Sequence, residues 1–111
     1  MATVEKKNLN HPEETKKLQK AKKESVNVAG VTITRITAEP GWRWSKDMKP
    51  VGATGSCQVD HIVYVVSGRL KVRMDDGKEE EFGPGDMGHV PPGHDGWTLG
   101  DKPVAWLEIP H

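Results

Sequence analysis

Glycine and proline punctuate the chain between residues 67 and 93 more regularly than any other residues. Turn signals recur about every eight to ten residues, at Ser67-Gly68, Asp76-Gly77, Pro84-Gly85 and Pro92-Gly93. Proline presets φ at the second position of a turn, and glycine accepts positive φ at the next. Only short strands fit between these turns. The spacing therefore predicts a meander of short antiparallel strands closed into a barrel or sandwich.

Side-chain alternation predicts where these strands lie. In the segment 70–74, Leu70, Val72 and Met74 share one face. Strands are expected at residues 31–38, 61–66, 70–74, 78–82 and 104–109, with the first barrel strand beginning near residue 26. The Asp-Gly pair at 76–77 predicts a type I′ hairpin turn. Trp42 and Trp44 would share one face if their segment were extended.

The first 25 residues differ in composition from the rest of the chain. Lysine and glutamate dominate from Glu5 to Glu24, with few apolar side chains. A short helix capped by Asn10 with Pro12 just inside it, an extended segment and partial disorder all remain open. We expect a polar charged arm over residues 1–25 and a barrel domain over residues 26–111.

Charge and cysteine content exclude several classes of partner. Lys+Arg and Asp+Glu both number 16, so the net charge is zero and gives no general attraction to nucleic acid or anionic membranes. No apolar run approaches the roughly 18 residues of a transmembrane helix, and the N-terminus lacks the apolar core of a secretory signal. The one cysteine cannot form an intrachain disulfide and fits a reducing cytoplasm.

Two blocks of the chain resemble the two sequence motifs of the cupin superfamily. Gly68 ends the first block, and a glycine, proline and glycine of the second fall at residues 85, 91 and 93. The stretches 41–45 (Gly-Trp-Arg-Trp-Ser) and 91–97 (Pro-Pro-Gly-His-Asp-Gly-Trp) resemble a subgroup of small single-domain cupins. The resemblance runs from about Pro40 to Ile109. It implies an all-β jelly-roll barrel and a homodimer.

The resemblance does not keep the metal ligands of the family at their own positions. The two expected histidines fall where the chain has Thr54 or Gly55, and Ser56 or Cys57. His61 stands in place of the expected glutamate, and Gly96 in place of the last histidine.

Cys57, His61 and His94 remain as candidate substitute ligands. One thiolate and two imidazoles suit Zn²⁺ first, or copper. On a regular strand, residues 57 and 61 would lie roughly 13 Å apart, so a shared ion requires a turn at residues 58–60. The alternative is that Cys57 is a small buried hydrophobe and His61 forms hydrogen bonds within the barrel.

Trp42, Trp44, Trp97 and Asp95 are candidate ligand-binding residues. The indoles would line a cavity, because small-molecule sites are mostly apolar with a few polar anchors. They would equally fill the barrel or a dimer interface. Asp95 would orient His94, or accept backbone hydrogens in its own loop.

Two classes of function remain open. The favoured one is a cytoplasmic module that binds a small molecule in the barrel, with or without a divalent transition metal. The alternative is a small metal-dependent enzyme of isomerase or oxygenase type that uses the Cys/His site. The sequence assigns no catalytic residue.

Overall fold

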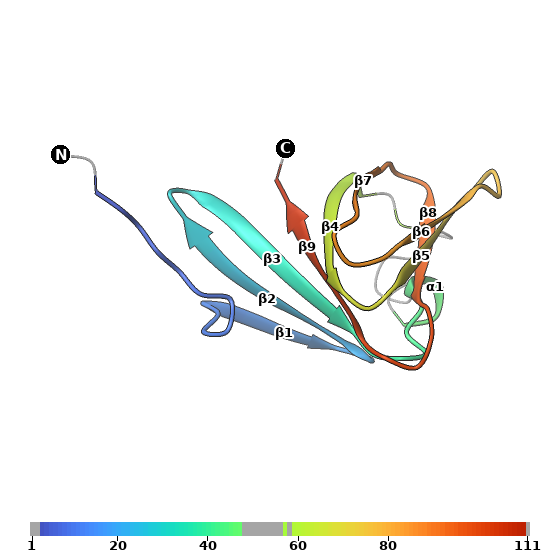
Figure 1. The fold of residues 1–111 in the computed structure, drawn as a ribbon, viewed down its shortest axis with the longest axis horizontal. Helices are drawn as coiled ribbons and strands as arrows, with labels where there is room; N and C mark the ends of the chain where they lie inside the picture. Colours follow the sequence, from blue (N-terminus) through green and yellow to red (C-terminus); the bar gives the residue numbers. More distant parts are fainter. Residues whose placement is uncertain (1–2, 48–56, 58, 111) are drawn as a thin grey trace.

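The computed structural model describes residues 3–47, 57 and 59–110, and its strands form two antiparallel sheets (Figure 1). The larger sheet has the strand order β1-β2-β3-β9-β4-β7, and the smaller has the order β6-β5-β8. The elements are β1 (Glu14–Leu18), β2 (Ala21–Val28), β3 (Val31–Ala38), α1 (Trp44–Asp47), β4 (His61–Ser67), β5 (Leu70–Met74), β6 (Glu79–Phe82), β7 (Met87–Val90), β8 (His94–Thr98) and β9 (Val104–Ile109). The all-β antiparallel barrel predicted from the turn spacing is confirmed.

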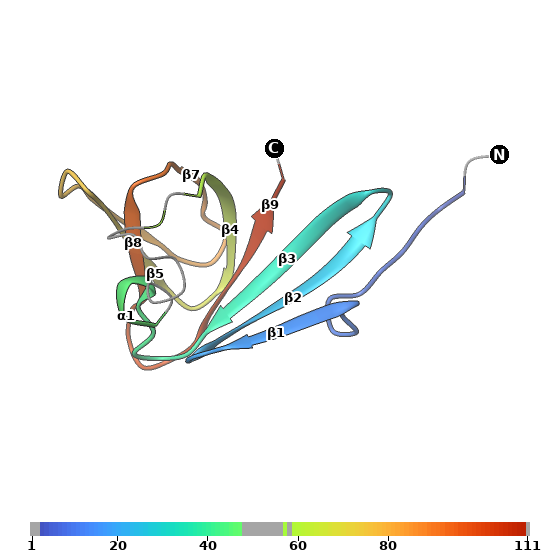
Figure 2. The ribbon, with the colours of Figure 1, turned by 180° about the vertical axis from the view of Figure 1, so that it is seen from behind.

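The barrel occupies one side of the molecule. Figures 1 and 2 show β4 to β8 curling around a common centre, while β1, β2 and β3 extend away from it toward the N-terminus. β9 joins the two parts, because it pairs with β3 on one edge and with β4 on the other. The molecule measures 51 × 28 × 26 Å along its principal axes.

The strands at residues 31–38, 70–74 and 104–109 are confirmed, but the turn prediction after β5 is wrong. A type I′ turn needs positive φ at two consecutive residues, and between β5 and β6 only Gly77 has it, with φ 91°. The Met74 N–H donates to the Lys78 carbonyl at 2.7 Å, which closes a three-residue loop over residues 75–77, and the Gly77 N–H donates to the Met74 carbonyl at 2.9 Å. The two-residue turn of this kind lies between β2 and β3, at Ala29 (φ 52°) and Gly30 (φ 80°).

The N-terminal segment takes the extended alternative over Glu14–Leu18. β1 pairs with β2, in a register that puts Glu14 opposite Ser25 and Leu18 opposite Ala21. β1 and β2 therefore enter the range expected to be an arm, and the barrel sheet begins before residue 26.

The second tryptophan of the 42–44 stretch does not lie in an extended segment. α1 begins at Trp44, and the N–H of Ser45 in its first turn donates to Asp95 Oδ1 at 3.0 Å. This carboxylate satisfies a backbone group that a short helix cannot satisfy itself, and so favours the helix over a strand. No helix within the described residues is long and apolar enough to cross a membrane.

The hydrophobic core lies between the two sheets. Val65 and Val104 are fully buried at its centre, and Trp42 packs on Trp106 with ring centroids 5.8 Å apart. Gly68 lies against this region with φ 75°, and a Cβ there would lie 2.2 Å from the Pro103 carbonyl oxygen. Only glycine fits this close backbone approach, which holds the start of β9 against the turn before β5.

Candidate metal centre and ligand cavity

A cavity of about 160 Å³ lies inside the barrel. Its walls are mostly apolar, with indoles from Trp42, Trp44 and Trp106 and aliphatic side chains from both sheets. Its polar side chains are Lys23, Cys57, His61, His94 and Glu108. Two of the three tryptophans predicted to bind a ligand, Trp42 and Trp44, are among the lining residues.

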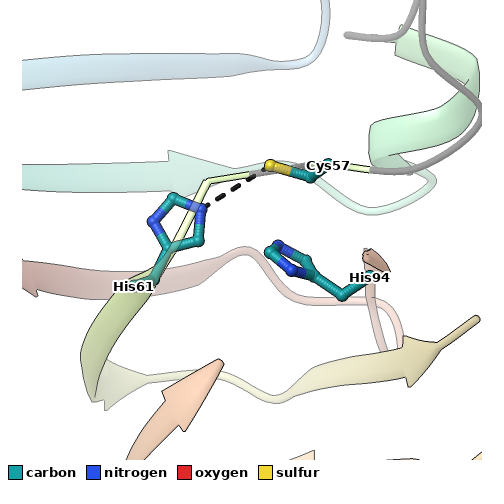
Figure 3. Close-up of side chains that lie close together, drawn as sticks. All are labelled: Cys57, His61 and His94. Carbon is teal, nitrogen blue, oxygen red and sulfur yellow. Dashed lines mark hydrogen bonds between the residues drawn. The ribbon is translucent and has the colours of Figure 1, made fainter. Parts of the chain in front are cut away.

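The side chains of Cys57, His61 and His94 lie close together (Figure 3), and all three line this cavity. One potential ligand atom from each residue lies within 4.8 Å of those from the other two. Cys57 Sγ is 3.7 Å from His61 Nε2, and the two imidazole centroids are 5.2 Å apart. The candidate ligands predicted from the sequence therefore lie together.

Backbone pairing explains why residues 57 and 61 meet. Cys57 forms an isolated bridge with His94, in which its N–H donates to the His94 carbonyl at 2.7 Å. His61 begins β4, which pairs with β7 and β9 instead. The chain leaves one sheet and enters the other between the two residues. Thr54, Gly55 and Ser56, the other positions considered for ligands, lie outside the described residues.

Both imidazoles are oriented through Nδ1. His94 Nδ1 lies 2.8 Å from the Pro91 carbonyl oxygen, and His61 Nδ1 lies 3.3 Å from Glu108 Oε2. Because these oxygens only accept, each Nδ1 carries the proton and donates it. Nε2 is then the remaining nitrogen on each ring. Metal-binding histidines are oriented in this way by a carbonyl or carboxylate behind the ring.

The Cys57 thiol and the His61 imidazole shift each other's pKa. Burial raises the pKa of Cys57, but hydrogen bonds from His61 and His94 outweigh burial and lower it to about 6. Burial lowers the pKa of His61, whereas its hydrogen bonds with Cys57 and Glu108 raise it to about 9. At neutral pH the pair is therefore a thiolate and an imidazolium, and a metal ion would replace the proton of the imidazolium.

Glu108 and Lys23 belong to the site, and sequence reasoning missed both. Glu108 bonds His61 through one oxygen and accepts from Trp106 Nε1 at 3.4 Å through the other. Burial raises the pKa of Glu108, but His61 and the charge of Lys23 hold it below the usual 4.5. In β9, Glu108 lies on the same face as Val104 and Trp106, because side chains alternate along a strand. This alternation in the sequence could have indicated that Glu108 points into the barrel.

Asp95 and Trp97 lie outside the cavity lining. Asp95 accepts from Arg43 Nε at 2.9 Å and from Ser45 Oγ at 2.7 Å, and Arg43 Cζ lies 4.4 Å above the Trp97 ring centroid. Burial raises the pKa of Asp95, but the hydrogen bonds from Ser45 and Arg43 hold it below 3.8. Alternation along β8 separates both residues from His94, whose side chain is on the opposite face.

The donor set fits a zinc ion. A cysteine sulfur and two histidine Nε2 atoms are ligands that Zn²⁺ prefers, and both rings already have the partners that fix their orientation. Three protein ligands with one open position are typical of zinc sites that act on small molecules.

Comparisons with known proteins agree with this architecture. Residues 57–110 match the sequence profile of the family described as Cupin domain. The polyketide cyclase RemF from Streptomyces resistomycificus has a similar fold, with TM-score 0.67 and 16% identity over 96% of this chain and 78% of that one. KdgF from Halomonas sp. has TM-score 0.63 and 19% identity over 97% and 96% of the two chains. Ectoine synthase from P. lautus has TM-score 0.66 and 13% identity over 96% and 78%. No curated protein matches the chain in sequence.

Proposed function

We propose that this chain, which is a small cupin-domain protein, binds one divalent transition metal ion and holds a small molecule against it inside the barrel. The metal ligands are Cys57, His61 and His94, and zinc is the first choice of ion. The convergence of their three donor atoms within 4.8 Å at the wall of an apolar cavity carries the proposal.

Each part of the site has a separate role. When bound, the ion supplies a Lewis-acidic position for an oxygen atom of the ligand. Glu108 holds the His61 ring, and the Pro91 carbonyl holds the His94 ring, so neither imidazole has to reorganise. The indoles of Trp42 and Trp106 exclude water from the ligand's apolar part.

A metal-dependent enzyme of isomerase or oxygenase type is the second candidate. The three-ligand donor set favours it, because catalytic zinc sites keep a fourth position open. Within the described lining of the cavity, however, the one carboxylate is Glu108, and both of its oxygens are engaged by Trp106 and His61. A general acid or base needs a free position next to the ligand, so binding is favoured over catalysis.

Elemental analysis of the purified, untagged protein tests the metal site. We expect about one equivalent of zinc per chain in the wild type. The variants His61→Ala and His94→Ala should lose it, because two remaining donors hold zinc weakly. His11→Ala is the matched control, since His11 is an exposed histidine away from the cavity.

Circular dichroism of each variant separates loss of metal from loss of fold. Metal-free wild-type protein that stays folded and takes up no zinc, copper, iron, manganese or nickel on dialysis would overturn the metal site. Equal metal content in wild type and both histidine variants would overturn the ligand assignment.

The proposal extends to a reducing, cytoplasmic compartment and a homodimer. Cys57 is a free buried cysteine whose thiolate the metal site requires, and an oxidising compartment would put that thiolate at risk. The homodimer rests on the family resemblance alone, and sedimentation at micromolar concentration would test it.

A further inference from the structure

The hairpin formed by β1 and β2 holds lysines opposite one another. The register of the two strands puts Lys16 opposite Lys23 and Lys17 opposite Lys22. Side chains that are directly opposite across antiparallel strands have their Cβ atoms about 5 Å apart, and like charges in that position destabilise the pair. The hairpin therefore contains two repulsive pairs that its fold does not need.

The two pairs lie on opposite faces of the sheet. Lys23 lines the barrel cavity, and Lys16 shares its face. Because side chains alternate along a strand, Lys17 and Lys22 lie on the outer face. Their row continues onto β3, where Lys22 is opposite Thr37. The outer face thus presents two ammonium groups and one hydroxyl group in a row across three strands.

A surface hollow of about 250 Å³ lies at this row. Its polar lining consists of Lys17, Lys20, Lys22, Thr37 and one acidic residue, Glu39. Three ammonium groups and one carboxylate leave two units of positive charge in the hollow. The hollow is therefore a cationic site with a hydroxyl donor on its wall.

The charges of these lysines are poorly balanced by the protein itself. Among the described residues, neither Lys17 nor Lys20 forms an ion pair. Lys22 Nζ lies 3.8 Å from Glu24 Oε1, but that oxygen already accepts from Arg35 Nη2 at 3.0 Å and from Arg35 Nε at 3.3 Å. Glu24 is thus neutralised by Arg35, and the hollow keeps its positive charge.

The backbone holds the third lysine at the end of the hairpin. Lys20 has φ 57°, a left-handed conformation that favours glycine over residues with a side chain. Its carbonyl accepts from the Glu39 N–H at 2.8 Å, which fixes this turn against the end of β3. A lysine at this position keeps a cationic side chain at the hollow in spite of an unfavourable backbone conformation.

From these features we propose that the hollow binds a phosphate group, as inorganic phosphate or as the phosphate of a small phosphomonoester. A phosphate dianion matches two units of positive charge, and lysines bind phosphate oxygens as point charges. The Thr37 hydroxyl can donate to a further oxygen. The bound dianion would also offset the repulsion between Lys17 and Lys22. This site does not depend on the proposed function, because it lies on the face of the sheet away from the metal ligands.

Calorimetry with three probes at low salt and about pH 8, where phosphate is mainly a dianion, tests the ligand class. Inorganic phosphate should bind at one site per chain. Dimethyl phosphate, which has a single negative charge, should bind about tenfold more weakly. Glycerol 3-phosphate distinguishes the two sources of the group. If it binds at least as tightly as inorganic phosphate, the ligand is a monoester, and if it binds more weakly, the ligand is the free ion.

Single substitutions assign the binding to the outer face. Lys17→Gln should weaken inorganic phosphate about tenfold, because it removes one charged donor. Lys17→Arg keeps the charge and should bind phosphate as tightly as wild type. Lys16→Gln is the matched control, since it removes a neighbouring lysine of the same strand on the opposite face and should leave phosphate affinity unchanged.

Thermal unfolding gives a second readout, which a merely structural role would not produce. Without phosphate, Lys16→Gln and Lys17→Gln should both unfold at a higher temperature than wild type, because each relieves one pair of like charges. Added phosphate should raise the unfolding temperature of wild type and Lys16→Gln. It should leave that of Lys17→Gln almost unchanged.

Three results would overturn the phosphate site. The first is folded wild-type protein that binds neither inorganic phosphate nor the monoester at millimolar concentration. The second is equal weakening by Lys16→Gln and Lys17→Gln, which would show a general attraction of anions and not a site at the hollow. The third is loss of phosphate binding in His61→Ala, which would place the anion at the metal cluster. Loss of zinc with phosphate binding intact would overturn the metal site alone.

Discussion

The inner and outer faces of β8 each contribute to a cluster of polar side chains, but the two clusters differ in the groups that are paired. On the inner face, His94 meets Cys57 and His61, and each imidazole keeps Nε2 toward the cavity. On the outer face, Asp95 accepts from Arg43, from Ser45 twice and from the Gly96 N–H. A carboxylate held by fixed donors stabilises the fold, whereas a thiol and two imidazoles that face one another can exchange the protons between them for a metal ion.

Glu108→Gln should give the largest difference between the two faces. The amide keeps the size of the side chain but loses the charge that orients and supports His61. Zinc affinity should fall about 10–100-fold, the usual effect of removing such a partner. Competition with a chromogenic chelator measures it. Unchanged zinc affinity would show that Glu108 serves the barrel and not the metal ligands.

Asp95→Asn should lower the free energy of unfolding and leave the zinc affinity unchanged. The amide gives up one of two acceptor oxygens and the charge that pairs with Arg43, which costs about 1–2 kcal/mol of unfolding free energy. Urea unfolding of the metal-free protein gives this value, and the chelator assay should match wild type. A clear fall in zinc affinity with an unchanged free energy of unfolding would show that Asp95 supports the metal cluster and not the fold.

Arg43→Lys should give the smallest effect, because the ammonium keeps the positive charge beside Asp95 and gives up only the planar contact with the Trp97 ring. The guanidinium is partly exposed and lies over the Trp97 ring, an arrangement worth about 0.5–1 kcal/mol. Urea unfolding of the metal-free protein should show a decrease of that order, with zinc affinity unchanged in the chelator assay. A fall in zinc affinity in this variant would show that the outer face of β8 acts on the metal cluster.

Local chemistry made most of the fold predictable. Turn residues and alternation located β3, β5 and β9, because a strand between two tight turns has few alternatives. The type I′ prediction at Asp76-Gly77 failed because the hairpin closes with a three-residue loop. The helix at Trp44 could not be predicted, because its stabilising carboxylate, Asp95, is distant in sequence.

The site was predictable in part. Residue type and family resemblance identified Cys57, His61 and His94 as candidate metal ligands before their positions were known. Alternation along β9 indicated the face of Glu108, but its contact with His61 depended on the pairing of β9 with β4, and the place of Lys23 depended on the pairing of β2 with β3, which local sequence does not reveal.

β9 has a consequence for how the protein can change over evolutionary time. Val104, Trp106 and Glu108 follow one another on the same face of this strand, at the core, the cavity wall and the metal cluster. A one-residue shift of register would turn all three away together. Natural variants of this chain should therefore be able to alter the ligand through residues such as Gly96, which lines the cavity from the opposite sheet. The register of β9, in contrast, cannot change without disrupting the core, the cavity wall and the metal cluster together.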